Sequence, residues 1–199
     1  EARIGAAIRE RGGLPPGFVL ATKLDRDMDT GRFDADRARR SAEESLQALG
    51  VDRFQILHLH DPEHARDLDE IVRKGGALDT LLRMKEEGLV QATGLAMGRT
   101  DMLLPLLKDW PVDIVLSHNR FTVLNRSAEP VMDLAAARGV AFFNAAPYAS
   151  GVLAKGSAQV QRITYQEVDD AALGPVRAVE ALCRRHGVAP GALALQYSM

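Results

Sequence analysis

Three histidines lie close together in the segment ILHLHDPEH, which spans residues 56–64. One leucine separates His58 from His60, and His64 follows after Asp-Pro-Glu. Imidazole can ligate a metal ion or transfer a proton near neutral pH, so both kinds of chemistry are open to this segment. Side chains alternate between the two faces of a β-strand, so a strand here would point His58 and His60 to the same side.

Further polar side chains follow other short apolar runs of the chain. Lys23 comes directly after the run FVLAT, and the segment SHNR at 117–120 brings His118 to the end of another run. The segment NAAPYASG at 144–151 ends a third run. In α/β barrels the catalytic groups sit where strands end and loops begin. We therefore expect these side chains to converge with His60 on one mouth.

Short apolar runs alternate with helical periods along the whole chain. The runs that we expect to form strands are FVLAT (18–22), FQILHL (54–59), VQATGLAM (90–97), VDIVLS (112–117) and VAFFNAA (140–146). Between them, apolar residues recur at helical spacing. Four helical patterns are followed by glycine, at Gly50, Gly88, Gly139 and Gly187, and Thr100 is expected to cap another. Glycine suits the residue after a helix because it adopts the left-handed conformation without strain.

This alternation predicts parallel strands joined by helical crossovers, which leaves a doubly wound sheet or a (β/α)₈ barrel. A doubly wound nucleotide-binding domain usually has a glycine-rich loop after its first strand, whereas FVLAT is followed by KLDRD. The barrel is therefore favoured. We expect residues 1–199 to form a single barrel domain with about five of the eight strands. The chain begins and ends inside helical patterns, so we expect a longer chain to continue at both ends.

Composition excludes several classes of partner. The 199 residues carry 25 Lys and Arg against 27 Asp and Glu, a net charge of -2, so no basic surplus indicates nucleic acid or an anionic membrane. The single cysteine rules out an internal disulfide. Cys183 lies in step with Val176 and Val179, and we expect it to be buried and inert. No run reaches the length of a membrane span, and no signal peptide is evident, so a cytoplasmic protein is expected.

Two interpretations of the histidine pair compete on the residues alone. An HxH pair at a strand end resembles the metal ligands of amidohydrolase-type barrel enzymes, and a metal-dependent hydrolase using His58 and His60 is one alternative. Such a site needs at least a third placed ligand, and His118 is the only other histidine at a strand end. The other interpretation makes His60 an acid–base residue without a metal. A non-catalytic protein that binds a nucleotide or a partner is a third alternative.

Five segments together resemble the aldo-keto reductase family, most closely its bacterial members that act on aldoses. They are FVLATKLDRD, SAEESLQALGVDRFQILHLHDPE, LLRMKEEGLVQATGLAMG, SHNRFTVLNRSA and NAAPYASGVLAKG, and they occur in the order of the family. The resemblance implies a (β/α)₈ barrel that binds NADP or NAD without a Rossmann domain. It also implies hydride transfer between nicotinamide and the carbonyl or hydroxyl carbon of a small aldehyde or sugar.

The family catalyses this reaction with a tyrosine, a lysine, an aspartate and a histidine. Lys23 matches the lysine and His60 the histidine, whereas the aspartate and tyrosine would lie before residue 1. The three tyrosines of the chain, Tyr148, Tyr165 and Tyr197, do not match the catalytic one. His58 would then be a second inward residue one layer deeper, and His64 a solvated loop residue. A neighbouring lysine lowers the pKa of a phenol, which is the role implied for Lys23.

The resemblance also implies cofactor contacts. His118 stands where the family often has a glutamine that holds the nicotinamide amide, and Tyr148, Ser150 and Gly151 match the loop that meets the pyrophosphate. The sequence departs from the family at Ala96–Met97, where serine and asparagine are usual, and at Ala145, where an aromatic residue often stacks on the ring. The segment at 154–170 would follow the last strand, as a lid or as a variable surface loop.

Overall fold

A computed structural model describes residues 1–199 and contains a five-stranded parallel sheet in chain order, β1-β2-β3-β4-β5. The strands are β1 (Ala21–Leu24), β2 (Phe54–His60), β3 (Val90–Met97), β4 (Ile114–His118) and β5 (Ala141–Ala145). All neighbouring strands pair in parallel. The five expected strands and their parallel arrangement are therefore confirmed.

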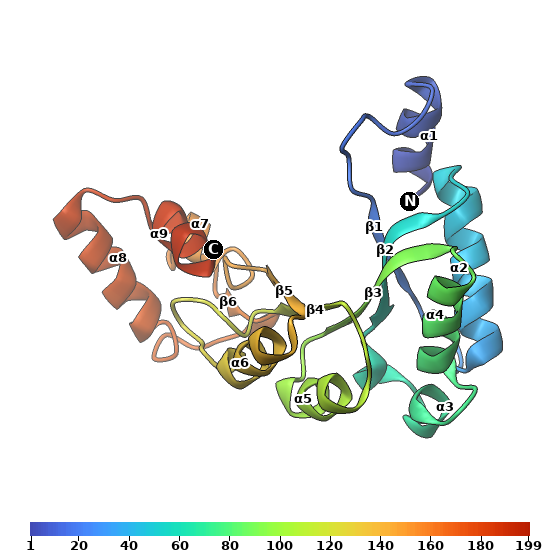
Figure 1. Cartoon of the computed structure of the whole chain (residues 1–199). Helices are drawn as coiled ribbons and strands as arrows, with labels where there is room; N and C mark the ends of the chain where they lie inside the picture. The colour runs from blue at the N-terminus through green and yellow to red at the C-terminus, as the bar shows by residue number, and fades with distance from the viewer.

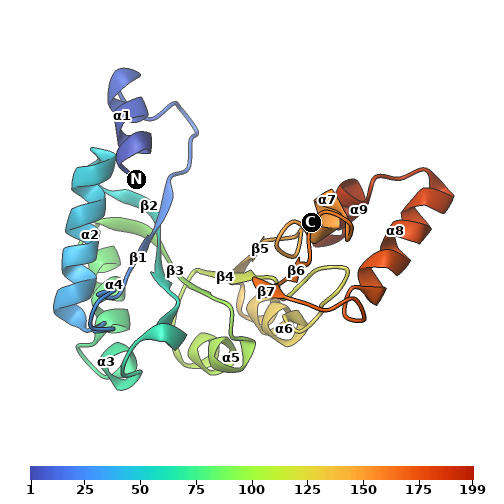
Figure 2. The same cartoon turned by 180° about the vertical axis from the view of Figure 1, so that it is seen from behind.

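Helices connect the strands and cover one face of the sheet, and the opposite face is concave (Figure 1, Figure 2). The connecting helices are α2 (Ala35–Leu49), α3 (Asp69–Val72), α4 (Ala77–Glu86), α5 (Thr100–Asp109) and α6 (Glu129–Arg138). Before the first strand comes α1 (Ala2–Glu10), and after the last come α7 (Val152–Lys155), α8 (Gly174–His186) and α9 (Pro190–Ser198). A short 3-10 turn, η1 (Pro62–His64), follows β2. No helix is both long and apolar enough to span a membrane.

Glycine ends the helices as the sequence indicated. Gly50, Gly139 and Gly187 follow α2, α6 and α8 with φ angles of 69°, 68° and 64°. Gly88 also has a positive φ, but it lies two residues beyond the end of α4. These left-handed residues turn the chain back toward the next strand.

The first strand begins later than expected. Phe18 and Val19, which open the apolar run, are 51% and 60% exposed. Pairing with β2 begins at Ala21, opposite Ile56, and Leu20 accepts a hydrogen bond from Ile56 N, whereas Phe18 and Val19 are not paired with β2. The expectation of a strand at 18–22 was wrong at its start, because strand ends are set by the partner and not by hydrophobicity alone.

The expected cap of α5 was also wrong. Thr100 is the first residue of the helix, and Arg99 occupies the capping position without a side-chain hydrogen bond. A carboxylate from another loop takes over part of this role. Glu63 Oε1 accepts hydrogen bonds from the backbone N–H groups of Gly98, at 2.8 Å, and Arg99, at 3.2 Å.

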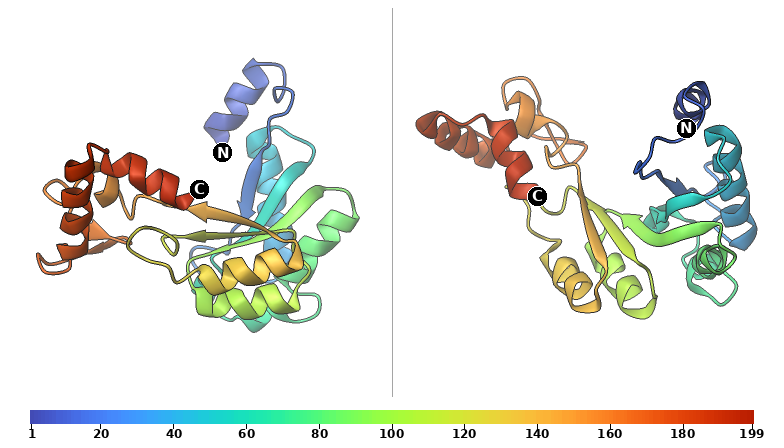
Figure 3. Two further views of the ribbon diagram at one scale, coloured as in Figure 1. Left: turned by 60° about the vertical axis from the view of Figure 1, so that its left-hand side comes forward. Right: turned by 45° about the horizontal axis from the view of Figure 1, so that its top comes forward.

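Two hydrophobic clusters stabilise the chain. The larger has 25 buried residues and lies between the sheet and the helices that cover it. The smaller has six buried residues, which come from the segment 149–153, α8 and α9 and from Leu173 before α8. Cys183 on α8 is 2% exposed, as expected. Figure 3 shows the C-terminal helices standing beyond β5, away from α1–α4.

A small antiparallel hairpin follows α7 and was missed at the sequence level. Its strands are β6 (Arg162–Ile163) and β7 (Gln166–Glu167). Thr164 and Tyr165 form its tip with positive φ angles of 50° and 68°. The hairpin lies within the segment at 154–170, for which both a lid and a variable surface loop are compatible with the sequence.

Candidate active site

A chamber of about 320 Å³ opens at the carboxyl ends of the parallel strands. Its lining residues are Lys23, His60, Asp61, Ala96, Leu116, His118, Ala145, Ala146 and Tyr165. All five strands contribute residues at or near their carboxyl ends: Lys23, His60, Ala96, Leu116 and His118, and Ala145. Because parallel strands end at the same edge of a sheet, groups far apart in sequence meet here.

Lys23 and His60 come from neighbouring strands. Lys23 lies opposite His58 in the register of β1 and β2, so His60 lies two residues further along the same face. Both side chains line the chamber, as expected for the candidate catalytic pair. Strand alternation and parallel pairing are sufficient to place an ammonium group and an imidazole in one concavity.

Asp25 fixes the His60 ring. His60 Nδ1 donates to Asp25 Oδ1 at 2.5 Å, and this hydrogen bond is the largest cause of the lowered pKa of Asp25. Partial burial opposes the shift, and the charges of His60 and Lys23 support it. A carboxylate only accepts hydrogen bonds, so in the neutral ring the His60 proton sits on Nδ1. The other ring nitrogen, Nε2, carries no hydrogen and lies 3.5 Å from Asp61 Oδ2.

His118 is held at the end of β4 on the other side of the chamber. Asn119 Nδ2 donates to His118 Nδ1 at 3.3 Å, which leaves Nε2 as the nitrogen that carries hydrogen in the neutral ring. A Cβ atom at Gly98 would lie 2.7 Å from Cε1 of His118 and 2.8 Å from Nε2. The absence of a side chain at Gly98 therefore makes room for this imidazole.

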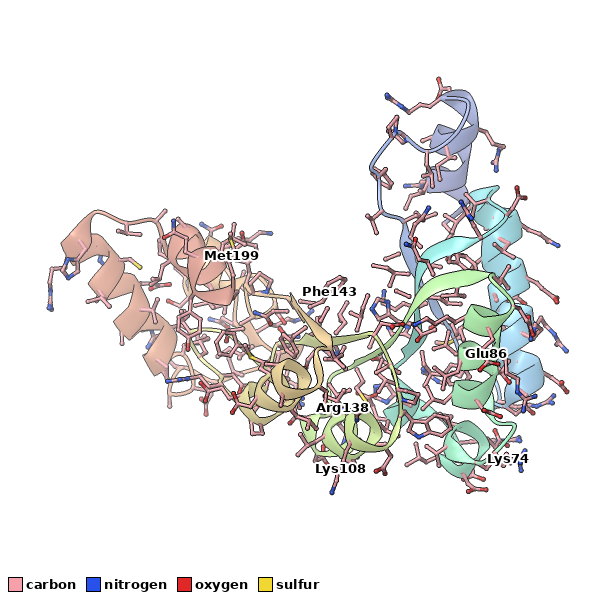
Figure 4. All side chains as sticks on the ribbon, in the orientation of Figure 1. Lys74, Glu86, Lys108, Arg138, Phe143 and Met199 are labelled. Atoms are coloured by element: carbon pink, nitrogen blue, oxygen red, sulfur yellow. The ribbon has the colours of Figure 1, made fainter.

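His58 lies one layer deeper than His60, as expected, and is 2% exposed. Burial is the main reason that its pKa is lowered to about 4. Its Nε2 atom has no hydrogen-bond partner. Its ring approaches that of Phe143, labelled in Figure 4, with centroids 6.2 Å apart. His58 is therefore a neutral residue of the barrel interior and does not line the chamber.

A wider vestibule of about 720 Å³ adjoins the chamber and shares His60, Asp61, His118 and Tyr165 with it. His64 is exposed and lines only the vestibule, in keeping with the loop position expected for it. No group of three or more His, Cys, Asp and Glu side chains is arranged to hold a metal ion. The histidine pair therefore lacks the further ligands that a metal-dependent hydrolase needs.

The expected cofactor residues are only partly brought together. His118 lines the chamber, but Tyr148, Ser150 and Gly151 do not. Tyr148 packs against the smaller hydrophobic cluster. Ser150 Oγ accepts a hydrogen bond from the Tyr165 backbone N–H at 2.6 Å, which ties the loop to the tip of the hairpin. Ser150 and Gly151 both have positive φ angles, 65° and 92°.

Three residues of the site were missed at the sequence level. Asp25 and Asp61 belong to segments that were singled out, directly after β1 and β2, and their place at strand ends was the available signal. Tyr165 gave no such signal. It is 64% exposed and reaches the chamber only because the hairpin folds back, with its ring centroid 6.0 Å from that of His118.

An open parallel sheet with helices on one face, and polar groups at the carboxyl ends of its strands, defines an α/β-barrel type of protein. The aldo/keto reductase family model matches residues 1–199. The chain belongs to the aldo/keto reductase family.

Curated relatives and a solved structure agree with this assignment. L-galactose dehydrogenase from Arabidopsis thaliana is 30% identical over 185 residues, covering 92% of this chain and 56% of the relative. D-threo-aldose 1-dehydrogenase from a Pseudomonas species is 29% identical and covers 92% and 54%. The chain thus spans about half the length of these relatives. A Bombyx mori aldo-keto reductase in complex with NADP is similar in fold, with a TM-score of 0.65, 18% identity, and coverage of 98% of this chain and 61% of that one.

Proposed function

We propose that the protein is an NAD(P)-dependent oxidoreductase that transfers hydride between nicotinamide and the carbonyl or hydroxyl carbon of an aldehyde or aldose. The observation that carries the proposal is the pairing of Lys23 with His60 in one chamber at the strand ends of an aldo/keto reductase. The partner of the reaction is a small molecule with a carbonyl group. Two relatives named as dehydrogenases of sugars support the aldose class.

The concavity suits a nicotinamide cofactor in size and lining. Chamber and vestibule share four residues and form a continuous space in the range of small-molecule sites. Ala96, Ala145 and Ala146 line the chamber and leave room for a flat ring. We assign His118 to the amide of that ring, and Tyr148, Ser150 and Gly151 to the pyrophosphate. The NADP complex of the Bombyx mori neighbour supports the choice of cofactor.

The bound nicotinamide supplies or accepts the hydride, and the protein handles the oxygen of the substrate. Lys23 brings a positive charge to the place where negative charge develops on that oxygen. Because Nδ1 of His60 donates to Asp25, Nε2 is free to accept a hydrogen bond from the hydroxyl group of an alcohol substrate and so to orient its oxygen. Proton transfer between a positioned side chain and the reacting group commonly contributes a factor of about 10²–10⁴ to the rate of such a reaction.

Replacing Lys23 by methionine in the full-length protein tests the proposal. Lys23→Met removes the ammonium group and keeps a side chain of similar length, so we expect kcat for aldose oxidation to fall by roughly a hundredfold or more. The measurement is the steady-state change of NAD(P)H absorbance, and cofactor affinity is followed by fluorescence quenching. Lys74→Met, at an exposed position labelled in Figure 4, is the matched control and should keep wild-type activity.

The two alternative functions predict different results when the wild-type protein is assayed for turnover, cofactor binding and sensitivity to a chelator. A non-catalytic relative would bind NADP(H) without turnover in the wild-type protein. A metal-dependent hydrolase would lose activity with a chelator and would not need NADP(H). Wild-type rates in Lys23→Met would show that Lys23 does not take part in the reaction.

A further inference from the structure

Asp61 is the only carboxylate among the nine residues that line the chamber. The other polar groups of the chamber are the Lys23 ammonium, the imidazoles of His60 and His118 and the Tyr165 hydroxyl. The remaining lining side chains are apolar. The chamber therefore offers several donors for a substrate oxygen, and one carboxylate that only accepts hydrogen bonds.

The backbone at Asp61 is held in an unusual conformation. Its φ and ψ angles are 41° and 55°, in the left-handed region that glycine, asparagine and aspartate adopt more readily than other residues. Its N–H donates to Ala96 O on β3 at 2.8 Å, and its carbonyl accepts from His64 N at 3.0 Å. Both bonds belong to the backbone and would fix the turn for another residue as well.

The Asp61 carboxylate lies between the two histidines without a hydrogen bond to either. Oδ2 lies 3.5 Å from His60 Nε2, and Oδ1 lies 3.9 Å from His118 Nε2. Oδ1 is buried and has no hydrogen-bond partner. An ionised carboxylate can accept about four hydrogen bonds, and leaving one oxygen without a donor costs free energy. The two imidazole contacts are ion pairs only when the rings are protonated, and no hydrogen bond within the protein holds the Asp61 carboxylate.

Glu63, two residues further on, shows the contrast. Its Oε2 atom also lacks a partner, but its Oε1 atom accepts from the backbone N–H groups at the start of α5 and so has a structural role. The Asp61 side chain is 24% exposed and faces both the chamber and the vestibule. Because Oδ1 is buried, the exposed part of the carboxylate is where a ligand in the chamber can donate a hydrogen bond.

We propose that Asp61 is a substrate-binding residue that accepts a hydrogen bond from a hydroxyl group next to the reacting carbon. This inference rests on the proposed function, because it takes His60 Nε2 as the contact of the reacting oxygen. Asp61 Oδ2 lies beside that nitrogen, so the group that it meets is on the neighbouring carbon of the substrate. The preferred substrates are then α-hydroxy aldehydes, the class to which aldoses belong, over simple aldehydes. A carboxylate at this place also disfavours substrates with an acidic group beside the carbonyl.

Two variants remove the carboxylate without disturbing the turn. Glycine and asparagine both tolerate the left-handed backbone, so Asp61→Gly and Asp61→Asn should fold. Asp61→Gly removes the acceptor, whereas Asp61→Asn keeps an oxygen and removes the charge. Asp52→Asn, an exposed aspartate before β2, is the control for the change in net charge. Circular dichroism of the full-length variants verifies the fold.

The measurement is kcat/KM for 2-hydroxypropanal divided by kcat/KM for propanal. We expect the wild-type protein and Asp52→Asn to favour the hydroxy aldehyde. The ratio should fall by roughly tenfold or more in Asp61→Gly and by less in Asp61→Asn. Calorimetry in the presence of NADP should show that the variants also lose the preference in binding affinity for propane-1,2-diol over propan-1-ol.

The outcomes separate this inference from the proposed function. A wild-type protein that reduces both aldehydes without preference, or variants that keep the wild-type ratio, would overturn the role of Asp61 and leave the oxidoreductase assignment intact. A wild-type protein that reduces neither aldehyde nor any aldose would contradict the proposed function, and the inference with it.

Discussion

His58 and His60 share one strand and one face but differ in what surrounds them. His60 is about a third exposed, at 32% of its side chain, and contacts Asp25. His58 lies at the level of Gly94 in the register of β2 and β3, where a Cβ atom would come within 2.5 Å of its ring. One layer of depth in the sheet separates a partly exposed imidazole from a buried one whose pKa is lowered to about 4, because burial disfavours the charged form.

The depressed pKa of His58 makes stability depend on pH in a defined window. The pKa is about 4 in the folded state and about 6.5 in the unfolded chain, so the unfolded state binds more protons between these values. The free energy of unfolding should therefore rise from pH 4 to pH 6.5 and be flat above it, by at most about 3 kcal/mol from this residue. Urea unfolding followed by the fluorescence of Trp110 measures this.

Two variants isolate the contribution of His58. His58→Gln should flatten the rise between pH 4 and 6.5, whereas His64→Gln, at an exposed position, should retain it. An equal pH dependence in wild type and His58→Gln would mean that His58 is not the group responsible. The His58→Gln substitution does not change the lining of the chamber, because His58 is not one of its lining residues.

The elements of the site depend on small residues at specific levels of β3 and just beyond it. Gly94 accommodates His58 and Gly98 accommodates His118. These contacts join a strand to its neighbours on both sides, because β3 pairs with β2 and with β4. The position of each imidazole therefore depends on the backbone at or just after β3 as well as on its own strand.

A methyl group at Gly98 tests the assignment of His118. Gly98→Ala would place a carbon within 2.8 Å of His118 Nε2, so the ring must turn away from its present position. If His118 holds the cofactor, the Kd for NADPH should increase by roughly tenfold, about 1.4 kcal/mol. Fluorescence titration of the full-length protein measures this. Gly174→Ala, where a Cβ meets no atom within 4 Å, is the control, and an unchanged Kd in Gly98→Ala would exclude His118 from cofactor binding.

At the scale of the whole molecule the two hydrophobic clusters are unequal. The sheet and its covering helices bury 25 residues in one cluster, whereas the C-terminal segment buries six. Regions with fewer buried contacts open more readily. The hairpin that brings Tyr165 to the chamber belongs to this less buried part of the chain, so the mouth of the site is expected to open before the strands that carry Lys23 and His60.

Hydrogen exchange followed by mass spectrometry tests this order. We expect peptides from α8, α9 and the hairpin to exchange faster than peptides from β2, β3 and α4 in the absence of cofactor. Binding of NADP should slow exchange in the hairpin, because its tip lines the chamber. Equal protection of the two parts of the chain would contradict this prediction and show that the smaller hydrophobic cluster does not open first.

The parallel α/β arrangement followed from the sequence because it depends on periodicity, which is local. The five apolar runs gave the strands, and glycine at positions 50, 139 and 187 gave the helix ends. Strand alternation was enough to point His58 and His60 to one side. The place of Lys23 and His60 near the ends of β1 and β2 was likewise predictable, since every parallel strand delivers its last side chains to the same edge.

Only the tertiary structure decided which groups contact these residues. The Asp25–His60 hydrogen bond spans 35 positions, the cap of α5 by Glu63 spans 35, and Tyr165 reaches His118 through a hairpin. The start of β1 was set by its partner β2 and not by the apolar run. The difference in depth between His58 and His60 is also tertiary. Periodicity fixes the face on which a side chain lies, whereas its partners and its burial depend on how distant segments pack against that face.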